Sequence, residues 1–325
     1  MRMRLISLML LFSLGGSSYH FAVKPITAHR IIIRAERLEK PLISTSTLLR
    51  YVDGWSITSE DESFGGLSSL MLDKNHFTAI SDIGAIVRFT VNQRGVFENA
   101  SISPLPKGCA RDQDKTGRDS ESITHDPRTG QIWIGLEWRN AICRSDDGLK
   151  TAAHVVAPQP MRVWPKTGGP ETMIRLNDGR FMIFAERARS DGAIPPILVY
   201  DRDPTLAKAH FQIIDYKAAE TGFAPTDGAM LPGGCLLILN RGFSLPYAFS
   251  TSLSLVEPIG ASLPKILSGQ TIARFGRPGL TSNFEGIAIS NEGNHIFVWL
   301  ISDNNFMWIE HTYLLKFEIL PAPKS

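Results

Sequence analysis

The stretch NFEGIAISNEGNHIFVWLISDNNF, residues 283–306, consists of two apolar runs separated by a polar turn that contains glycine. Glu285 lies near the start of the first run, and Asp303 ends the second run. Two apolar runs joined by a short turn of Asn and Gly are typical of a β-hairpin. Because a hairpin returns the chain to the level at which it began, we expect Glu285 and Asp303 to lie at the same end of it.

The same pattern recurs four more times along the chain. Each copy has a short apolar strand, a turn carrying Asp, Asn, Gly or Pro, and a second strand rich in large apolar residues; the copies are residues 65–91, 119–144, 169–187 and 225–243. The positions that open the hairpins are separated by 50 to 58 residues; they are Gly66, Glu121, Glu171, Asp227 and Glu285. A repeat of roughly this length with about four strands per unit predicts the blades of a β-propeller.

We therefore predict an all-β protein, a six-bladed β-propeller with four-stranded antiparallel blades. The chain has 27 glycines and 20 prolines and few stretches with a helical pattern, which favours many short strands joined by turns. The sixth blade is expected to combine residues 44–60 with the C-terminal run TYLLKFEIL, residues 312–320. Five blades and an open sandwich are the alternatives.

The first residues have the pattern of an export signal. Arg2 and Arg4 precede an apolar run of about ten residues, which is shorter than the ~20 residues of a membrane span. We predict a signal peptide over residues 1–22, with an uncleaved inner-membrane anchor as the alternative. A leader over residues 23–43 and a propeller domain over residues 44–320 follow, so the protein is expected to be periplasmic or secreted.

Charge and cysteine content give no reason to expect nucleic-acid binding or a zinc or iron–sulfur site. The formal net charge is +2, which gives no reason to expect nucleic acid, or a membrane beyond the export signal, as a partner. We expect a monomer that binds a small molecule. The three cysteines do not have the spacing of zinc or iron–sulfur ligands. Cys109 and Cys143 could pair in an exported protein, and Cys235 is expected to be a buried apolar residue.

In a propeller the equivalent positions of successive blades surround one axis, so the repeat predicts two sets of polar residues at one mouth. The strand-opening set is Glu121, Glu171, Asp227 and Glu285, and the strand-closing set is Asp82, Glu137, Glu186, Asn240 and Asp303. Neighbouring carboxylates repel unless something neutralises them. A calcium ion, interleaved arginines or backbone N–H groups of the next blade are all possible partners. The arginines that could interleave are Arg88, Arg139, Arg187 and Arg241.

These motifs resemble those of bacterial exported proteins with the phytase-like domain, also described as the esterase-like activity of phytase. The resemblance covers roughly residues 60–320 and rests on the five hairpin motifs, such as GPETMIRLNDGRFMIFAER from Gly169. It implies a phosphoesterase-type activity at repeated acidic positions, which here are Asp82, Glu121, Glu137, Glu171, Glu186, Asp227, Glu285 and Asp303. The fourth blade departs from the family pattern, because Asn240 stands before Arg241 where an acidic residue is common.

The leading hypothesis is a metal-assisted hydrolase of phosphate or other esters. The expected calcium ligands are Asp82, Glu121, Glu171, Asp227 and Glu285, and the expected catalytic carboxylates are Glu137, Glu186 and Asp303. The expected substrate-binding residues are Arg139, Arg187, Arg241, Asn240 and Asn304. A covalent serine route is not expected, because Gly-x-Ser-x-Gly is absent. The alternatives are a non-catalytic ligand-binding propeller of the envelope and a six-bladed hydrolase resembling sugar lactonases.

Overall fold

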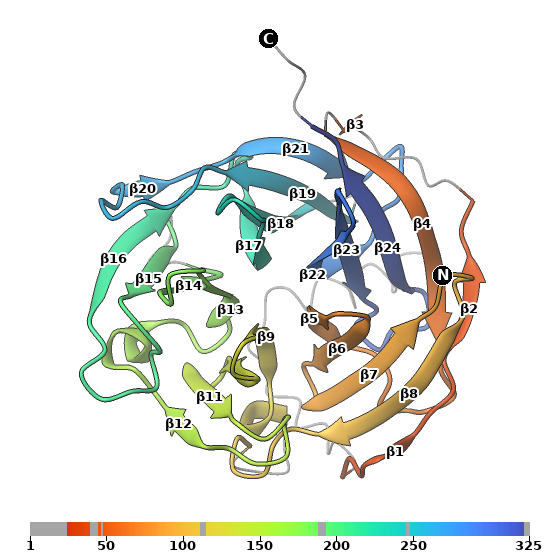
Figure 1. Cartoon of the computed structure of the whole chain (residues 1–325), viewed down its shortest axis with the longest axis horizontal. Helices are drawn as coiled ribbons and strands as arrows, with labels where there is room; N and C mark the ends of the chain where they lie inside the picture. Colours follow the sequence, from red (N-terminus) through yellow and green to blue (C-terminus); the bar gives the residue numbers. More distant parts are fainter. Residues whose placement is uncertain are drawn as a thin grey trace, which may run out of the picture.

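The computed structural model describes residues 25–39, 45–46, 48–110, 115–187, 193–244 and 248–321. These residues form five β-sheets arranged as blades around a central axis (Figure 1). The predicted signal peptide, residues 1–22, lies outside the described residues. In the part of the chain that the structure describes, no helix is long and apolar enough to cross a membrane.

The first two blades are built from the first two hairpin copies and the strands that follow them. From the axis outward, the first blade consists of β5 (Leu67–Asp73), β6 (His76–Ser81), β7 (Ala85–Val91), β8 (Phe97–Pro104) and β1 (His29–Arg30). The second blade consists of β9 (Ser120–Asp126), β10 (Gln131–Leu136), β11 (Ala141–Ser145) and β12 (His154–Val156). Two short 3₁₀ helices, η1 (Lys115–Gly117) and η2 (Gln159–Val163), flank the second blade in sequence.

The third and fourth blades follow in chain order. The third blade consists of β13 (Pro170–Arg175), β14 (Phe181–Ala185), β15 (Pro196–Tyr200), β16 (Phe211–Tyr216) and β20 (Ile266–Leu267). The fourth blade consists of β17 (Phe223–Met230), β18 (Leu236–Ser244), β19 (Ala248–Val256), β21 (Gln270–Phe275) and β3 (Thr45–Ser46). All pairs in these blades are antiparallel except β16 with β20, which run parallel.

The fifth blade joins the two ends of the chain. It consists of β22 (Asn283–Glu292), β23 (His295–Asp303), β24 (Thr312–Ile319), β4 (Leu49–Thr58) and β2 (Arg34–Arg37). The pairing of β4 with β24 runs from Leu49 opposite Ile319 to Ile57 opposite Thr312. The predicted partnership of residues 44–60 with the C-terminal strand is therefore confirmed for β4, but the number of blades is wrong. The two strands complete the fifth blade, because β24 already follows β22 and β23 in the same sheet.

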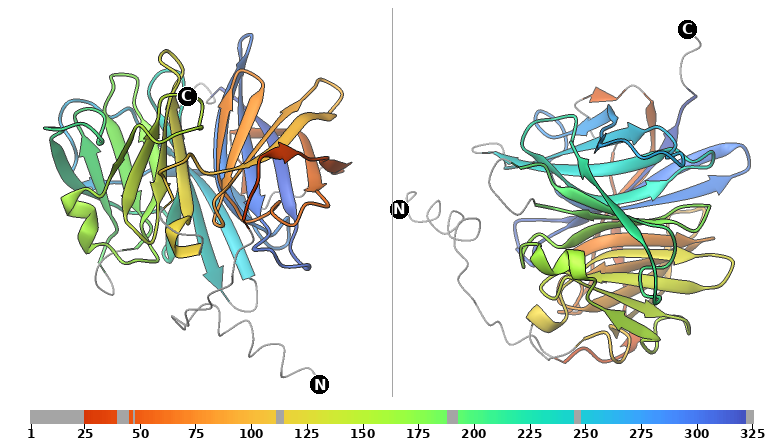
Figure 2. Two further views of the ribbon diagram at one scale, coloured as in Figure 1. Left: turned by 90° about the horizontal axis from the view of Figure 1, so that it is seen from below. Right: turned by 90° about the vertical axis from the view of Figure 1, so that its left-hand side faces the viewer.

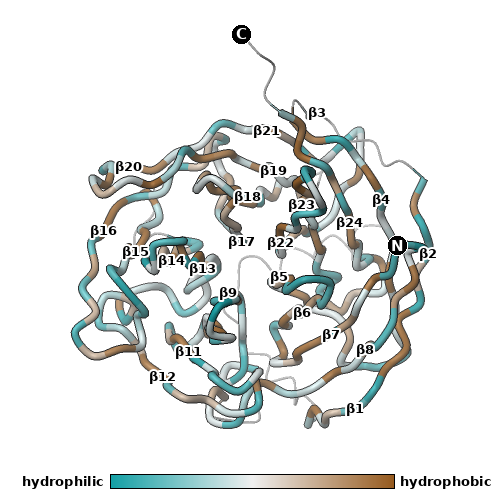
Figure 3. The backbone as a smooth tube through the Cα atoms, in the orientation of Figure 1, coloured by the Kyte–Doolittle hydropathy of each residue, from teal (hydrophilic) through white to brown (hydrophobic). Residues whose placement is uncertain are grey.

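The hydrophobic core lies between neighbouring blades. Among the described residues it forms five clusters of buried side chains, each shared between adjacent sheets. Where the first and fifth blades meet, Phe77 packs edge-on against Trp299 at 4.8 Å between ring centroids. Hydrophobic segments recur along the strands of every sheet (Figure 3). Because each blade packs against neighbours on both faces, all five residues of β14, FMIFA, are buried, and buried and exposed residues do not alternate along it.

The innermost strands bring the five hairpins together. Each of β5, β9, β13, β17 and β22 contacts the innermost strands of its two neighbours, and side views show the strands running steeply from one mouth to the other (Figure 2). Segments 50 or more residues apart in sequence therefore become neighbours at one mouth. The segment predicted as a leader also contributes β1 and β2, two short strands at the outer edges of the first and fifth blades.

Candidate functional site

Every innermost strand carries a β-bulge at the same level. The register shifts by one residue in all five strand pairs, and the extra residues are Ser68, Glu121, Glu171, Thr226 and Glu285. A bulge leaves one residue unpaired and redirects its side chain, and bulges are common next to functional sites. The repeated bulge explains why three glutamates from three different blades occupy equivalent positions.

A second set of equivalent residues ends the second strand of each hairpin. The backbone N–H groups of Asp82, Glu137 and Glu186 donate to the carbonyls of Gly66, Asp119 and Gly169, at 2.9, 3.0 and 3.4 Å. In the fifth blade Asp303 pairs with Asn283, and in the fourth blade Arg241 pairs with Ala224. The strand-closing set is therefore Asp82, Glu137, Glu186, Arg241 and Asp303, four carboxylates and one guanidinium group.

In the fourth blade, the predicted alignment of the hairpin with those of the other blades is wrong by one residue. Thr226, not Asp227, occupies the bulge, and Arg241, not Asn240, closes the second strand. A shift of one residue moves a side chain to the other face of a strand. Asp227 consequently points into the contact with neighbouring blades, where it accepts hydrogen bonds from Ser69 Oγ at 2.9 Å and Ile287 N at 3.0 Å.

Asn240 is also used in the core, between the third and fourth blades. It is fully buried, its Oδ1 accepts a hydrogen bond from the Tyr216 hydroxyl at 2.7 Å, and its Nδ2 donates to Ser254 Oγ at 3.2 Å. The structure thus places neither Asp227 nor Asn240 at the mouth, although the sequence predicted a metal ligand and a substrate-binding residue there. Both side chains have structural hydrogen-bonding roles.

The other acidic residues converge on the axis. Eight carboxyl groups belong to one connected cluster, named here the acidic funnel: Asp82, Asp119, Glu121, Glu137, Glu171, Glu186, Glu285 and Asp303. Within it, carboxylate oxygens of Asp119, Glu121 and Glu137 all lie within 4.8 Å of one another. Oxygen ligands of this kind are those that calcium prefers.

Asp119 was not among the predicted site residues. It stands two residues before Glu121, so both side chains face the axis on the same side of the chain. The Asp119 side chain is 4% exposed, and its Oδ1 is buried without a hydrogen-bond partner in the described part of the chain. A buried carboxylate oxygen without a partner is costly unless a ligand satisfies it.

Cationic side chains offset part of the negative charge. Arg241 contacts Glu285, Asn283 Oδ1 at 3.0 Å and Glu186 Oε1 at 2.8 Å, so it bridges three blades. Lys115, which the sequence reading missed, lies in η1 and pairs with Asp82 Oδ2 at 2.6 Å. Arg187 also pairs with Glu186 at 3.0 Å, and the eight carboxyl groups still outnumber these cations among the described residues, so the funnel is strongly acidic.

Hydrogen bonds between carboxyl groups show how the remaining charge is accommodated. Asp119 shares a hydrogen bond with Glu121, and Glu137 shares one with Glu171. Burial raises the pKa of Asp119 and the pKa of Glu137 to about 8. Burial, and then the charge of neighbouring carboxylates, also raises the pKa values of Glu121, Glu171 and Asp303 well above their usual range. Without a metal ion, protons must therefore neutralise part of the funnel near pH 7.

The remaining predicted substrate-binding residues occupy different places. Arg187 pairs with Glu186 at 3.0 Å and has a side chain 62% exposed at the rim. Asn304 accepts hydrogen bonds from the backbone N–H groups of Gly66 and Phe306, at 3.1 and 3.2 Å, so it holds a loop. Arg88, considered only as a neutralising cation, points outward to Ser103 and to the carbonyl of Gly148.

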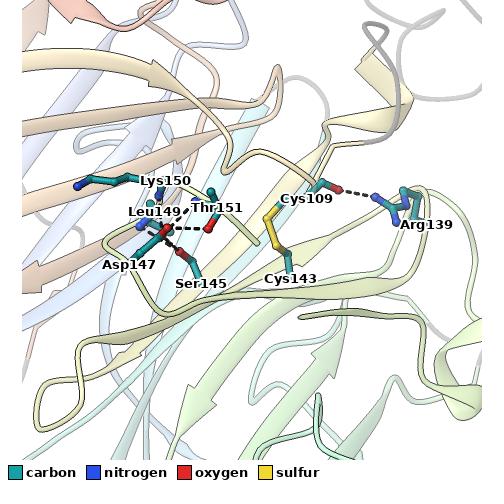
Figure 4. The surroundings of a disulfide bond; sticks show 8 residues. All are labelled: Cys109, Arg139, Cys143, Ser145, Asp147, Leu149, Lys150 and Thr151. Carbon is teal, nitrogen blue, oxygen red and sulfur yellow. Dashed lines mark hydrogen bonds between the residues drawn. A yellow bond between two sulfur atoms is a disulfide. The ribbon is translucent and has the colours of Figure 1, made fainter. Parts of the chain in front are cut away.

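Arg139 belongs to a disulfide region rather than to the funnel. Cys109, which follows β8, is bonded to Cys143 on β11, with 5.5 Å between their Cα atoms (Figure 4). Arg139 donates to the Cys109 carbonyl at 2.5 Å. The disulfide therefore ties the connection from the first blade to the second blade, and Cys235 remains a free, partly buried thiol packed against the core.

A cavity of about 500 Å³ lies elsewhere, at the outer side of the third blade. Its lining includes Arg180, Tyr200 and Phe211 together with the segment around Gly260. None of the acidic funnel residues lines it. We therefore assign the candidate site by its carboxylate chemistry and not by this cavity.

Gly66 makes room for the funnel at the edge of the first blade. Its φ of +59° suits glycine, and a side chain there would overlap both the Asp82 carboxylate and the Phe306 ring. We expect Gly66→Ala to lower the free energy of unfolding by about 2–4 kcal/mol, since a left-handed Ala costs about 1–2 kcal/mol before any overlap. Gly130→Ala is the matched control, because Gly130 has φ +75° and open space around it. Equal losses for the two variants in urea unfolding would contradict the overlap at Gly66.

Comparison with known proteins identifies a family for the chain. The family model described as phytase-like, esterase-like activity of phytase, matches residues 62–306, which contain the innermost hairpins of all five blades. The chain belongs to this phytase-like family. The similarity predicted from the hairpin motifs is thereby confirmed. No curated protein matches the chain.

Solved structures resemble this phytase-like chain only distantly. A protein of unknown function from Dyadobacter fermentans has 10% identity and a TM-score of 0.45, covering 84% of this chain and 99% of its own. The hydrazine synthase of Kuenenia stuttgartiensis has 10% identity and a TM-score of 0.39, covering 74% of this chain and 78% of its own. The Cps50 (Swd1) β-propeller domain of Myceliophteria thermophila has 9% identity and a TM-score of 0.38, covering 89% and 98%.

Proposed function

We propose that this phytase-like propeller is an exported hydrolase of phosphate or other esters that uses a calcium ion held in the acidic funnel. The observation that carries the proposal is the group of Asp119, Glu121 and Glu137, whose oxygens lie within 4.8 Å of one another. The buried Asp119 Oδ1 without a hydrogen-bond partner is what a metal ligand would look like before the ion binds.

The residues present fit a hard cation. Asp119, Glu121 and Glu137 would hold the ion, and Glu171 would orient Glu137 through their shared hydrogen bond. A bound calcium ion supplies Lewis acidity toward an ester oxygen and lowers the pKa of a water ligand. The fit concerns oxygen donors only, since no histidine or cysteine belongs to the group.

The surrounding side chains suggest how a reaction would be supported. Burial raises the pKa of the Asp303 carboxyl well above its usual range, and a carboxyl group perturbed in this way is a candidate general acid. Arg187 and Lys115 lie at the edge of the funnel with part of their side chains exposed, so they are placed to meet an incoming anion. Arg241 is already engaged by Glu186, Glu285 and Asn283, and it would mainly position those carboxylates.

Calcium titration by calorimetry and hydrolysis of p-nitrophenyl phosphate test the proposal. The mature protein is expected to bind calcium and to hydrolyse the ester only with calcium present. Glu121→Gln removes a ligand charge and should weaken calcium binding at least tenfold, about 1.4 kcal/mol. Glu36→Gln, on the exposed strand β2, is the matched control and should change neither property.

Two outcomes separate the candidate functions. Calcium binding without turnover of mono- or diesters would favour the non-catalytic ligand-binding propeller. Equal activity of wild type, Glu121→Gln and the double variant Glu137→Gln, Glu186→Gln would remove the funnel as the catalytic site. The positions of the residues do not support the lactonase alternative, because the sheets form five blades and Asn240 is buried between the third and fourth of them.

A further inference from the structure

The loop between β23 and β24 exposes four consecutive apolar side chains. Phe306, Met307, Trp308 and Ile309 have exposed fractions of 42%, 37%, 92% and 43%. Single exposed apolar residues are ordinary, but a run of four in a soluble domain is avoided unless it contacts something. Residues 304–311 are called here the apolar arm.

The apolar arm is held in place by its own hydrogen bonds. Asp303 Oδ1 accepts from Asn305 N at 2.7 Å, and Asn305 Nδ2 donates to Glu310 Oε2 at 2.8 Å. Asn305 and Phe306 have φ values of +48° and +51°, a conformation that side chains with a Cβ adopt only at a cost. A fixed and partly strained backbone therefore presents apolar side chains to solvent, which is the arrangement of a preformed binding surface.

The apolar arm is continuous with the acidic funnel. It begins directly after Asp303, a funnel carboxylate, and Asn304 ties it to the backbone of Gly66 at 3.1 Å. The Phe306 ring and the Asp82 carboxylate both lie against Gly66. The apolar side chains therefore project at the same mouth where the carboxylates converge.

The charge of the apolar arm argues against an anionic membrane surface as its binding partner. Residues 303–311 contain Asp303 and Glu310 and no lysine or arginine, so the arm lacks the basic residues that attract an anionic membrane surface. A ligand with an apolar group next to a polar, metal-binding group matches both halves of the mouth.

We propose that the apolar arm binds the apolar group of an amphiphilic ester whose polar head enters the acidic funnel. This rests on the proposed function and deepens it by naming the substrate class. The substrates would be esters with an aromatic or alkyl group next to the phosphate ester or carboxylic ester that reacts. Trp308 would lie against the apolar group, since a large rigid ring contributes most contact area for little lost entropy.

A matched pair of non-hydrolysable ligands tests this inference. 1-Naphthylmethylphosphonate and methylphosphonate share the head group and differ in the apolar group. In calorimetric titrations of the calcium-loaded protein, the naphthyl ligand is expected to bind at least tenfold more tightly. Trp308→Ala should reduce the ratio of the two affinities at least fivefold. Ile213→Ala, which truncates an exposed apolar residue on β16 of the third blade, should leave the ratio unchanged.

The outcomes distinguish this inference from the proposed hydrolysis. A naphthyl preference that depends on Trp308, without turnover of 1-naphthyl phosphate, supports the apolar arm and contradicts the hydrolase. Turnover of phosphate esters with equal affinity for both phosphonates contradicts the arm and leaves the hydrolase standing. Absence of binding by either ligand overturns the inference. Vesicles of neutral phosphatidylcholine that bind wild type but not Trp308→Ala, without any ligand preference, would assign the arm to a membrane surface and also overturn it.

Discussion

Replacing Arg241 with methionine should lower the free energy of unfolding by about 3–5 kcal/mol at pH 7, the usual cost of breaking a buried ion pair from one side. The Arg241 side chain is 20% exposed and pairs with Glu186 and Glu285 across three blades. Methionine matches much of its length but leaves Glu285 without this cation and Glu186 with only the exposed Arg187. The mutual repulsion of the two carboxylates then acts in a partly desolvated site, where charges are weakly screened.

Arg187→Met is the matched control for this prediction. Arg187 also pairs with Glu186, but its side chain is 62% exposed, and exposed ion pairs contribute only about 0–1 kcal/mol. Urea unfolding of both variants at low and high salt provides the measurement. Equal losses, or a loss for Arg241→Met of less than about 1 kcal/mol, would mean that the guanidinium group does not hold the funnel together. Added calcium should recover part of the loss, since a cation can take its place.

Much of the fold could be predicted from local sequence. The hairpins have turn residues between apolar runs, and these signals act over a few residues. The place of the terminal strands could not be read in this way, because it depends on the pairing of β4 with β24 across nearly the whole chain. Five hairpin copies in fact correspond to five blades. The sixth blade was inferred from terminal strands that had no hairpin copy of their own.

The repeat predicted most of the acidic residues that meet at the mouth, and it failed in the fourth blade, where Thr226 occupies the bulge and Asp227 follows it. Pro170 and Pro225 occupy equivalent positions, each directly before the bulged residue. Aligning the two prolines places Glu171 opposite Thr226 and would have removed Asp227 from the set. The sequence could also have identified Asp119 as a site residue, because it stands two residues before Glu121 as Asn283 does before Glu285. Nothing in the sequence pointed to Lys115, since it lies in a connection outside the repeat.

Stability of the metal-free protein is expected to fall as pH rises from about 5 to about 8. Burial raises the folded-state pKa of Asp119 and of Glu137 to about 8, whereas unfolded Asp and Glu titrate near 4. The folded state therefore binds more protons than the unfolded state in this window. The resulting stabilisation is complete below about pH 4 and is lost as pH rises through 8. Asp227, whose pKa burial also raises to about 8, contributes with the same sign.

The size of this pH dependence follows from the two hydrogen-bonded carboxyl pairs, Asp119 with Glu121 and Glu137 with Glu171. One extra bound proton changes the free energy of unfolding by about 1.4 kcal/mol per pH unit, so two pairs give on the order of 1–3 kcal/mol per unit. At about 2–4 °C per kcal/mol, the melting temperature should drop by at least ~5 °C between pH 5 and pH 8. The double variant Asp119→Asn, Glu121→Gln keeps hydrogen-bonding groups without the charge, and its melting temperature should depend less on pH.

Calcium should act in the opposite direction, and most strongly at high pH. The ion needs deprotonated carboxylates, so its binding competes with the protons that neutralise the funnel at lower pH. Calcium at about 100 times its dissociation constant would add about 2.7 kcal/mol at pH 8, which offsets part of the decline, and little at pH 5. Differential scanning calorimetry of chelator-treated and calcium-loaded protein at both pH values provides the measurement. A metal-free melting temperature that rises from pH 5 to pH 8 would show that the carboxylates are already paired by other cations. Equal calcium effects at both pH values would mean that the ion binds outside the acidic funnel.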